Sequence, residues 1–399
     1  MTTTESILKQ NPPGAGIPSR HSKKVMKGNI AAAEAVRLSR VSFVTAYPIT
    51  PQTTIIEEIA SMIARGDFDA ISVNMESEHS VFAALMGASL VGERVFTATS
   101  GQGLLYAHEV LHAIAHMRLP IVACNVGRPS FPWNIWADQS DSISQRDTGW
   151  VQYYCESSQE VLDTVLQSYK LSEKLGLPVM VVLDAFYLSH TSENVYIPDQ
   201  DLADTFLPAR RITENQVDLN HPKAFGGLVD PSLYDTYNRQ YWDAIHQVED
   251  ETIEMGHEFG ELFGREYGAV EAVNIHSGTK RILVTMATIT TTARQVIEHH
   301  PDVGLLKIRL FKPFPKKSVL DVLEMADEDC IIINIDRNFL GDHEGALMQE
   351  MKRALYGKPV KIFGIYAGLG GRDVPPETIE RILKINFESP QTEEVHWIK

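Results

Sequence analysis

From residue 28 onward, the chain alternates short apolar runs with segments in which apolar residues recur at helical spacing. In the first half, helical spacing covers 28–40, 55–66, 80–92, 104–117 and 159–176, and apolar runs cover 41–47, 70–75, 94–99, 120–126 and 178–185. Continuous apolar runs between amphipathic helices are typical of βαβ units, whose buried parallel sheet has helices on both faces. This half is therefore predicted to be a doubly wound α/β domain.

The same alternation returns after residue 280. Apolar runs cover 281–287, 303–310, 330–336 and 360–368, and helical spacing covers 291–300, 317–326, 344–357 and 375–387. The pattern predicts an α/β fold with two doubly wound parallel-sheet domains, at 25–200 and 276–399. Residues 201–275 contain several prolines and a charged helical segment at 241–268, and they are predicted to form a long connection between the two domains. Residues 1–24 are polar and predict an N-terminal arm, either disordered or wrapped around a partner subunit.

The composition and net charge argue against several classes of function. With 36 Lys and Arg against 52 Asp and Glu, the formal net charge is −16, which argues against nucleic acid or an anionic membrane as a partner. The sequence has neither a long apolar stretch nor the apolar core of a signal peptide, so the expected location of the protein is the cytoplasm. The three cysteines are far apart, so this chain alone predicts no disulfide framework and no complete iron–sulfur cluster.

Candidate chemistry follows the strands of the first block. In open parallel sheets, ligands bind beyond the carboxyl ends of the strands. There the chain places a rigid Pro-Ile-Thr-Pro turn containing Thr50, a carboxylate at Glu78, a glycine-flanked polar turn at 100–103, and Arg128. Each alone can be a turn or a helix cap. Their convergence at one edge favours a binding site, with Arg128 suited to a carboxylate and Thr50, between two prolines, a preorganised hydroxyl donor.

These motifs identify a family resemblance. YPITP at 47–51, ESE at 76–78, TSGQGL at 99–104 and the arginine after the next strand resemble the α subunit of 2-oxoacid:acceptor oxidoreductases, of which the pyruvate:ferredoxin enzymes are the best known. LLKIRLFKPFP at 305–315, IIINIDRN and IYAGLGGRD resemble the second domain of that family. The resemblance implies a thiamine-diphosphate pyrimidine-binding domain followed by a transketolase-C-terminal-like domain.

The resemblance also assigns roles. It implies that Glu78 hydrogen-bonds the aminopyrimidine of the cofactor as the catalytic acid, with Glu76 as the competing choice. It implies that Thr50 and Arg128 bind the keto and carboxylate oxygens of the substrate. The residues expected to line the cofactor are Pro48, Ser100 and Gln102, and no metal ligand is assigned to this chain.

The family's chemistry requires further chains. No GDG-x-N-type diphosphate–Mg²⁺ motif occurs in the sequence, so a β subunit is expected to supply the diphosphate-binding domain and Mg²⁺. Iron–sulfur clusters are expected on γ- and δ-type subunits, one of them ferredoxin-like. Coenzyme A is the expected co-substrate, and ferredoxin or an NAD-linked carrier the acceptor.

Three aromatic residues follow the expected carboxylate clamp: Phe131, Trp133 and Trp136. Such a cluster favours a flat, bulky 2-oxo acid such as phenylglyoxylate, with pyruvate next. The alternative is that these aromatic side chains pack at a subunit interface.

A rival motif, His108-Glu109-Val110-Leu111-His112, matches the HExxH pattern of zinc peptidases. A catalytic zinc needs three protein ligands, and no convincing third ligand follows in the sequence. The metallopeptidase therefore stays a minor alternative, with a histidine pair on a helix surface or interface as the simpler interpretation. A catalytically silent scaffold subunit is the other alternative.

Overall fold

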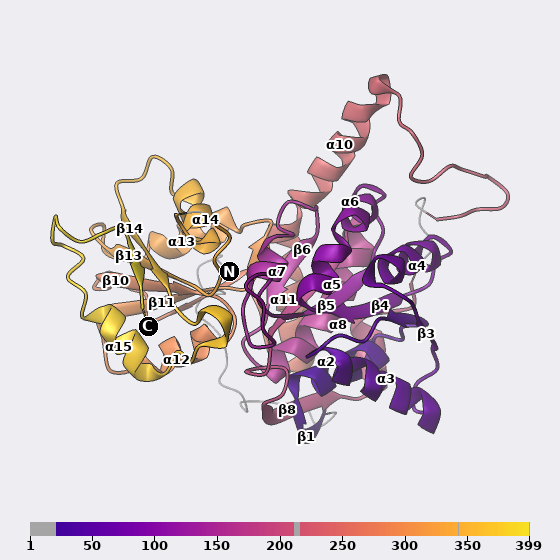
Figure 1. Ribbon diagram of the computed structural model, residues 1–399, viewed down its shortest axis with the longest axis horizontal. Helices are drawn as coiled ribbons and strands as arrows, with labels where there is room; N and C mark the ends of the chain where they lie inside the picture. The colour runs from indigo at the N-terminus through magenta and orange to yellow at the C-terminus, as the bar shows by residue number, and fades with distance from the viewer. Residues whose placement is uncertain (1–20, 211–215, 342, 399) are drawn as a thin grey trace.

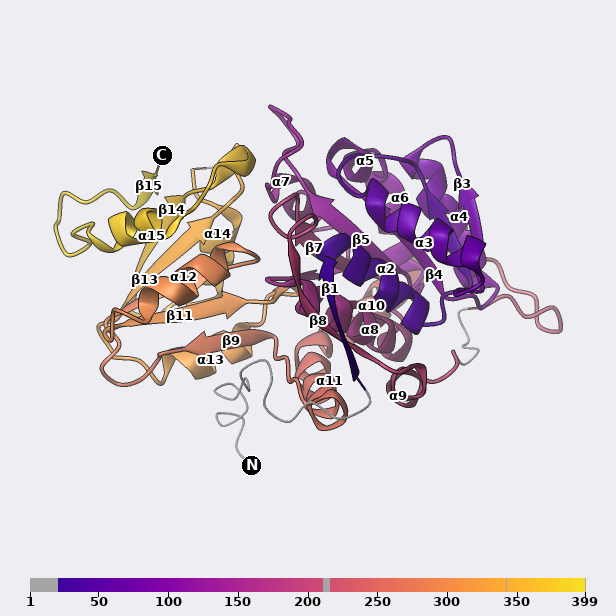
Figure 2. The ribbon, with the colours of Figure 1, turned by 90° about the horizontal axis from the view of Figure 1, so that it is seen from below.

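The structure, a computed structural model, describes residues 21–210, 216–341 and 343–398. Within these ranges the strands form a seven-stranded sheet, a six-stranded sheet and a two-stranded ribbon. The two larger sheets lie in separate lobes (Figure 1 and Figure 2). Residues 1–20 of the expected arm lie outside the described residues.

The seven-stranded sheet is the core of the first lobe. Its strands, in spatial order, are β12 (Leu310–Lys312), β6 (Val151–Tyr154), β7 (Val179–Asp184), β5 (Val122–Gly127), β4 (Val95–Thr99), β2 (Phe43–Ala46) and β3 (Ile71–Asn74). All neighbours run parallel except β12 and β6. The chain winds outward in opposite directions from β2 and β4, so the topological switch point lies between these two strands.

Helices cover both faces of this sheet. One face carries α2 (Gly28–Leu38), α3 (Thr53–Arg65) and α8 (Ser158–Leu175), and the other carries α4 (Glu78–Leu90), α5 (Gly101–Tyr106) and α6 (His108–His116). Successive side chains of a strand point to opposite faces, so Phe96 packs in the first core and Val95 in the second. Both are fully buried, as expected for a sheet between two helix layers.

The second lobe repeats this plan. Its strands, in spatial order, are β15 (Val395–Trp397), β14 (Lys361–Tyr366), β13 (Ile331–Asp336), β10 (Arg281–Thr285), β11 (Val303–Ile308) and β9 (Val270–Val273). Only β9 is antiparallel to its neighbour. Helices α12 (Ile289–Ile297) and α15 (Pro376–Leu383) pack on one face, and α13 (Lys316–Leu323) and α14 (Ala346–Ala354) on the other. The predicted α/β class with two parallel-sheet domains is confirmed.

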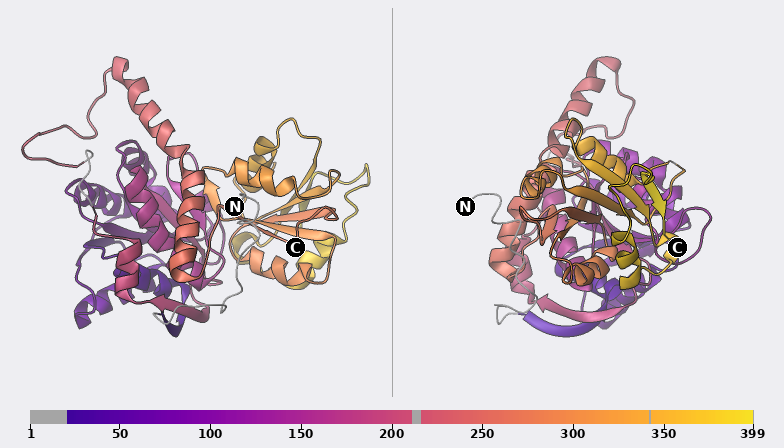
Figure 3. Two further views of the ribbon diagram at one scale, coloured as in Figure 1. Left: turned by 180° about the vertical axis from the view of Figure 1, so that it is seen from behind. Right: turned by 90° about the vertical axis from the view of Figure 1, so that its left-hand side faces the viewer.

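Several helices and a two-stranded ribbon lie in or next to the connection between the lobes. Strands β1 (His21–Lys27) and β8 (Ser192–Pro198) form the antiparallel ribbon, followed by α9 (Gln200–Phe206), α10 (Pro231–Ile245) and α11 (Val248–Phe263). Helix α10 stands away from the body of the molecule (Figure 3). None of the helices in the described ranges combines the length and apolar character needed to cross a membrane. The division into domains at 25–200, 201–275 and 276–399 stays a prediction. Strand β1 begins at His21, before the predicted start of the first domain, and β9 of the second sheet lies before residue 276.

Two strands depart from the sequence-based expectation. The run 303–310 was expected to be one strand, but it ends at Ile308, and β12 crosses to pair with β6 of the first sheet. Arg309 lies at the crossing and is 2% exposed. Its guanidinium donates to Gln167 Oε1 at 2.8 Å and lies 3.1 Å from Glu160. A buried arginine needs such partners, and they hold this segment against α8 of the first lobe.

Candidate functional site

The predicted site residues gather at the carboxyl edge of the first sheet. The loops that carry Thr50 and Ser100 follow β2 and β4, the strands at the topological switch point. Arg128 bridges this edge, since it donates to the backbone oxygen of Thr50 at 2.7 Å and to Gln102 Oε1 at 2.8 Å. Three of the expected segments are therefore tied together by one guanidinium.

Glu78 occupies the first turn of α4. Ser77 caps this helix, because its side chain accepts from Ser80 N at 3.2 Å. The Glu78 side chain is only 7% exposed and lies against the backbone of Gly103. A β-carbon at position 103 would lie 2.3 Å from Glu78 Oε1, so only glycine leaves room for this carboxyl group.

Arg128 is 6% exposed, and burial lowers the pKa of its guanidinium, although the charges of Asp141 and Glu78 oppose this shift. Its Nε has no hydrogen-bond partner among the described residues, and a β-carbon on Gly101 would lie 2.3 Å from that atom. Gly101 itself adopts a φ of +52°. The Arg128 guanidinium is therefore a fixed, planar cationic group, of the kind suited to pairing with an anion.

The turn that precedes α5 is also buried. Ser100 is fully buried, and its Oγ has no hydrogen-bond partner among the described residues. Gln102 is half-buried, and its amide donates to the backbone oxygen of Ser130 at 2.5 Å. Buried hydroxyl groups nearly always have a partner, so the unpaired Ser100 hydroxyl marks this turn as a candidate binding position.

The other candidates are more exposed. Pro48 and Thr50 are exposed at the surface of their turn. Glu76, the competing catalytic acid, is exposed and hydrogen-bonded to Ser80, and this bond lowers the pKa of Glu76. Between the two carboxyl groups, only Glu78 is buried beside Arg128 and the turn at 100–103.

The three aromatic side chains do not close into one pocket. Phe131 is 71% exposed, Trp133 is 59% exposed and Trp136 is 49% exposed. Trp136 packs on Phe186 with ring centroids 4.8 Å apart, and its β-carbon fills the space beside Gly371 of the second lobe. The ring centroid of Trp133 lies 5.7 Å from the Arg128 guanidinium, so this ring lies beside the expected clamp.

Sequence reasoning missed Asp141. This fully buried carboxylate accepts from the backbone N–H of Gly101 at 2.8 Å and of Arg128 at 3.2 Å, and from Asn125 Nδ2 at 3.1 Å. Burial raises the pKa of Asp141 to about 6. Asp141 therefore connects the ends of β4 and β5. It lies in α7 (Ser140–Ile143), a segment without helical or strand periodicity, so its role depends on contacts distant in sequence.

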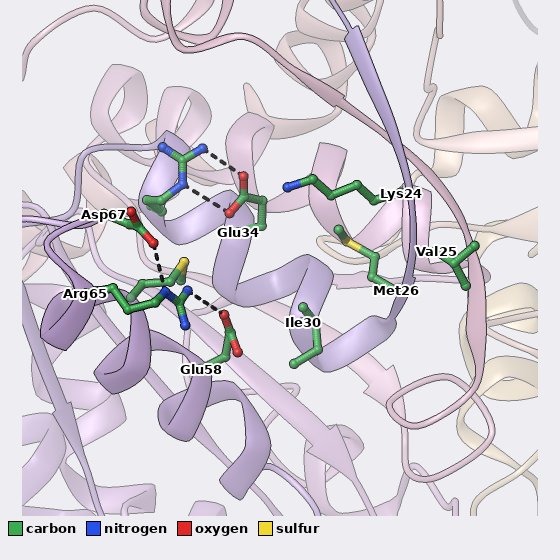
Figure 4. Close-up of a pocket in the computed structure, with 10 residues that line it drawn as sticks. Lys24, Val25, Met26, Ile30, Glu34, Glu58, Arg65 and Asp67 are labelled. Atoms are coloured by element: carbon green, nitrogen blue, oxygen red, sulfur yellow. Dashed lines mark hydrogen bonds and ion pairs between the residues drawn. The ribbon is translucent and has the colours of Figure 1, made fainter.

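A separate surface hollow lies away from these residues. A cavity of about 520 Å³ is formed by β1, α2 and α3 (Figure 4). Its arginines are paired with its own carboxylates, Arg37 with Glu34 and Arg65 with Glu58. It contains none of the predicted site residues.

The residues of the HExxH motif are not arranged as the zinc site of a peptidase. His108 and His112 lie together on α6, but Glu109 contacts His79 at 3.0 Å. Within the described residues, no group of three or more His, Cys, Asp and Glu side chains could hold a metal ion. The metallopeptidase alternative is therefore not supported.

Comparison with known families gives two matches. Residues 34–257 match the thiamine diphosphate-binding domain of pyruvate flavodoxin/ferredoxin oxidoreductases. Residues 279–379 match core domain II of pyruvate:ferredoxin oxidoreductase. The two matches fall on the two lobes.

Similar proteins agree with these matches. The ketoisovalerate oxidoreductase subunit VorA of Pyrococcus horikoshii is 42% identical, over 94% of this chain and 97% of its own. The pyruvate synthase subunit PorA of Methanothermobacter thermautotrophicus is 41% identical over the same shares. The 2-oxoglutarate:ferredoxin oxidoreductase of Magnetococcus marinus shares the fold, with a TM-score of 0.71 and 21% identity over 91% of this chain, which spans 65% of that chain. The chain therefore belongs to the 2-oxoacid:acceptor oxidoreductase family, among its α subunits.

Proposed function

We propose that this chain is the α subunit of a thiamine diphosphate-dependent enzyme that oxidatively decarboxylates a 2-oxo acid. The products are carbon dioxide and an acyl-CoA, and the electrons pass to iron–sulfur clusters on partner chains. The observation that carries the proposal is the buried carboxyl of Glu78 against Gly103, beside an arginine that bridges Thr50 and Gln102.

The residues present fit the pyrimidine half of the cofactor. Glycines at 101 and 103 bring Arg128 and Glu78 against the backbone, and the Ser100 hydroxyl and Arg128 Nε are buried without partners among the described residues. Glu78, Ser100, Gln102 and Pro48 would hold this half. When bound, thiamine diphosphate supplies the electron sink for decarboxylation.

This chain's side chains would do the following. Glu78 would hold a proton on its carboxyl group and donate it to the ring nitrogen of the aminopyrimidine. Arg128 would bind the substrate carboxylate, and the Thr50 hydroxyl would donate to the keto oxygen. Asp141 accepts hydrogen bonds from the backbone of Gly101 and Arg128, so its role would be that of a positioning residue.

A partner surface would complete the site. Exposed aromatic side chains in the segments that carry the site, Tyr106 at 62% and Phe131 at 71%, are offered as contacts for this partner. The proposed occupant is a β subunit that supplies the diphosphate site and Mg²⁺. The proposal further includes γ- and δ-type iron–sulfur subunits, with ferredoxin or an NAD-linked carrier as acceptor.

The proposed substrate is an aryl 2-oxo acid such as phenylglyoxylate, with pyruvate as the next choice. Its support is Trp133, whose exposed ring lies beside the Arg128 clamp. Turnover of phenylglyoxylate, 2-oxoisovalerate and pyruvate should be compared in wild type, Trp133→Leu and, as control, Trp242→Leu on α10. Preference for pyruvate, or equal effects of both variants, would remove this assignment.

The decisive test uses two neighbouring carboxyl groups. In the assembled complex, Glu78→Gln should abolish 2-oxo acid-dependent acceptor reduction, whereas Glu76→Gln should leave it within about twofold, because only Glu78 is buried in the site. Size-exclusion chromatography checks that both variants assemble. Near-normal activity of Glu78→Gln would contradict the proposal. Wild-type-like activity of Glu78→Ala, Thr50→Ala and Arg128→Ala would favour a silent scaffold subunit.

A further inference from the structure

Two histidine side chains on α6 face each other at the surface. His108 and His112 are one helical turn apart, with ring centroids 4.9 Å apart and planes at 84°. Their Nε2 atoms are 3.4 Å apart. His108 is exposed and His112 is half-buried, so both are accessible. Nothing in the proposed reaction uses either side chain.

The separation of these nitrogens matches a pair of metal ligands. With Zn–N bonds of about 2.0–2.1 Å, two ligands of a tetrahedral zinc ion lie about 3.4 Å apart. Imidazole nitrogens suit Zn²⁺, Ni²⁺ and Cu²⁺. We propose that His108 and His112 form a binding site for a divalent transition metal of this class.

The surroundings of His108 prepare it as a ligand. Its Nδ1 lies 2.6 Å from Gln145 Oε1. The amide nitrogen of Gln145 donates to Ser144 Oγ at 3.0 Å and to the Asp141 backbone oxygen at 3.4 Å, so its oxygen faces His108. His108 must therefore carry its proton on Nδ1 and keep the lone pair on Nε2. Such an outer hydrogen bond typically orients a metal-binding histidine.

His112 completes the pair. Its Nε2 faces Nε2 of His108, and its ring is half-buried beside that side chain. A neutral imidazole is the form that binds metal. Without metal, His112 donates from Nε2 to His108; on binding, that proton moves to Nδ1 through solvent, and no redox change is needed. The remaining coordination positions face water, so binding is weaker than at a closed four-ligand site.

The same helix offers a matched control. His116 lies one turn beyond His112, but its ring stacks on Tyr241 at 5.1 Å and its Nδ1 contacts the His112 backbone oxygen at 3.1 Å. The site does not imply peptidase activity, because Glu109 is engaged by His79.

Zinc binding to the purified, chelator-treated complex tests the proposal. Equilibrium dialysis against Zn²⁺, with zinc counted by mass spectrometry, should give one equivalent more per α chain in wild type and His116→Ala than in His108→Ala or His112→Ala. Alanine is favourable in a helix, and circular dichroism checks that each variant is folded. Equal zinc in wild type and both pair variants, or an equal loss in His116→Ala, would overturn the site. Because the readout is bound metal and not turnover, it is independent of the proposed reaction.

Discussion

The carboxylate of Asp184 and the guanidinium of Arg337 form an ion pair of 2.7 Å between the two lobes. Asp184 ends β7 of the first sheet, and Arg337 directly follows β13 of the second. Both are buried, and Asp184 also accepts from the backbone N–H of Thr288 at 3.1 Å. The carboxyl ends of the two sheets therefore meet through a hydrogen-bonded charge pair, which fixes the second lobe beside the edge that carries the candidate site.

Replacing Arg337 should destabilise the protein strongly. Arg337→Met leaves a buried carboxylate without its charge partner, and breaking a buried pair from one side typically costs about 3–5 kcal/mol. Urea denaturation should show this loss in the free energy of unfolding. Arg40→Met is the control, because its pair with Asp204 is exposed and such pairs contribute about 0–1 kcal/mol. Equal losses in the two variants would show that the pair between the lobes is unimportant.

A single methyl group at position 103 should impair catalysis. In Gly103→Ala, the new β-carbon displaces the Glu78 carboxyl group, which it would otherwise approach to 2.3 Å. We expect kcat to fall by about tenfold or more, because a misplacement of about 1 Å can cost a hundredfold in rate. Gly87→Ala on α4 is the matched control, since a β-carbon there meets open space. Unchanged kcat in Gly103→Ala would separate Glu78 from the reaction.

Loss of the proposed clamp should affect substrate binding. Arg128→Ala removes the charge partner of the substrate carboxylate and the bridge between Thr50 and Gln102. Steady-state kinetics should therefore show a KM at least about tenfold higher, with a smaller change in kcat. Arg65→Ala, an exposed arginine outside the site, should behave like wild type. An unchanged KM in Arg128→Ala would remove this residue from the substrate site.

Local sequence patterns were sufficient for most of the fold. Long helices such as α8 and buried strands such as β13 have the expected periodicity over their length. Strand β6 has only four residues in an irregular stretch, and β12 depends on Arg309 being buried against α8. The pairing of β6 with β12 depends on contacts between residues far apart in sequence, so no local sequence pattern predicts it.

The candidate site likewise has parts that local sequence patterns predict and parts that depend on contacts distant in sequence. The common location of Glu78, Ser100 and Arg128 could be predicted, because each lies in a segment that follows a parallel strand of the same sheet. Asp141 could not, because its role comes from backbone N–H groups about 13 and 40 residues away in sequence. The aromatic cluster was only partly understood, since Trp136 is held by Phe186 and by the glycine turn of the second lobe.

Asp336 should make the stability fall as the pH rises from about 4 to 6. Its carboxyl is fully buried at the start of α14, where it accepts from Leu347 N at 2.9 Å, and burial raises the pKa of Asp336 to about 6 from an ordinary 3.8. Because the folded state holds this proton more tightly than the unfolded state, the stabilisation is complete below about pH 4 and is lost as the pH rises to 6.

The slope of stability against pH separates this carboxyl group from the others. A pKa difference of about two units corresponds to up to about 3 kcal/mol. From pH 4 to pH 7, the free energy of unfolding of wild type should therefore fall further than that of Asp336→Asn, by up to this amount. Asp204→Asn should leave this slope almost unchanged, because a hydrogen bond to Arg40 lowers the pKa of Asp204, so that its contribution to stability is lost mainly below about pH 4. Urea titrations at several pH values measure both slopes, and parallel curves for wild type and Asp336→Asn would mean that Asp336 does not titrate in this range.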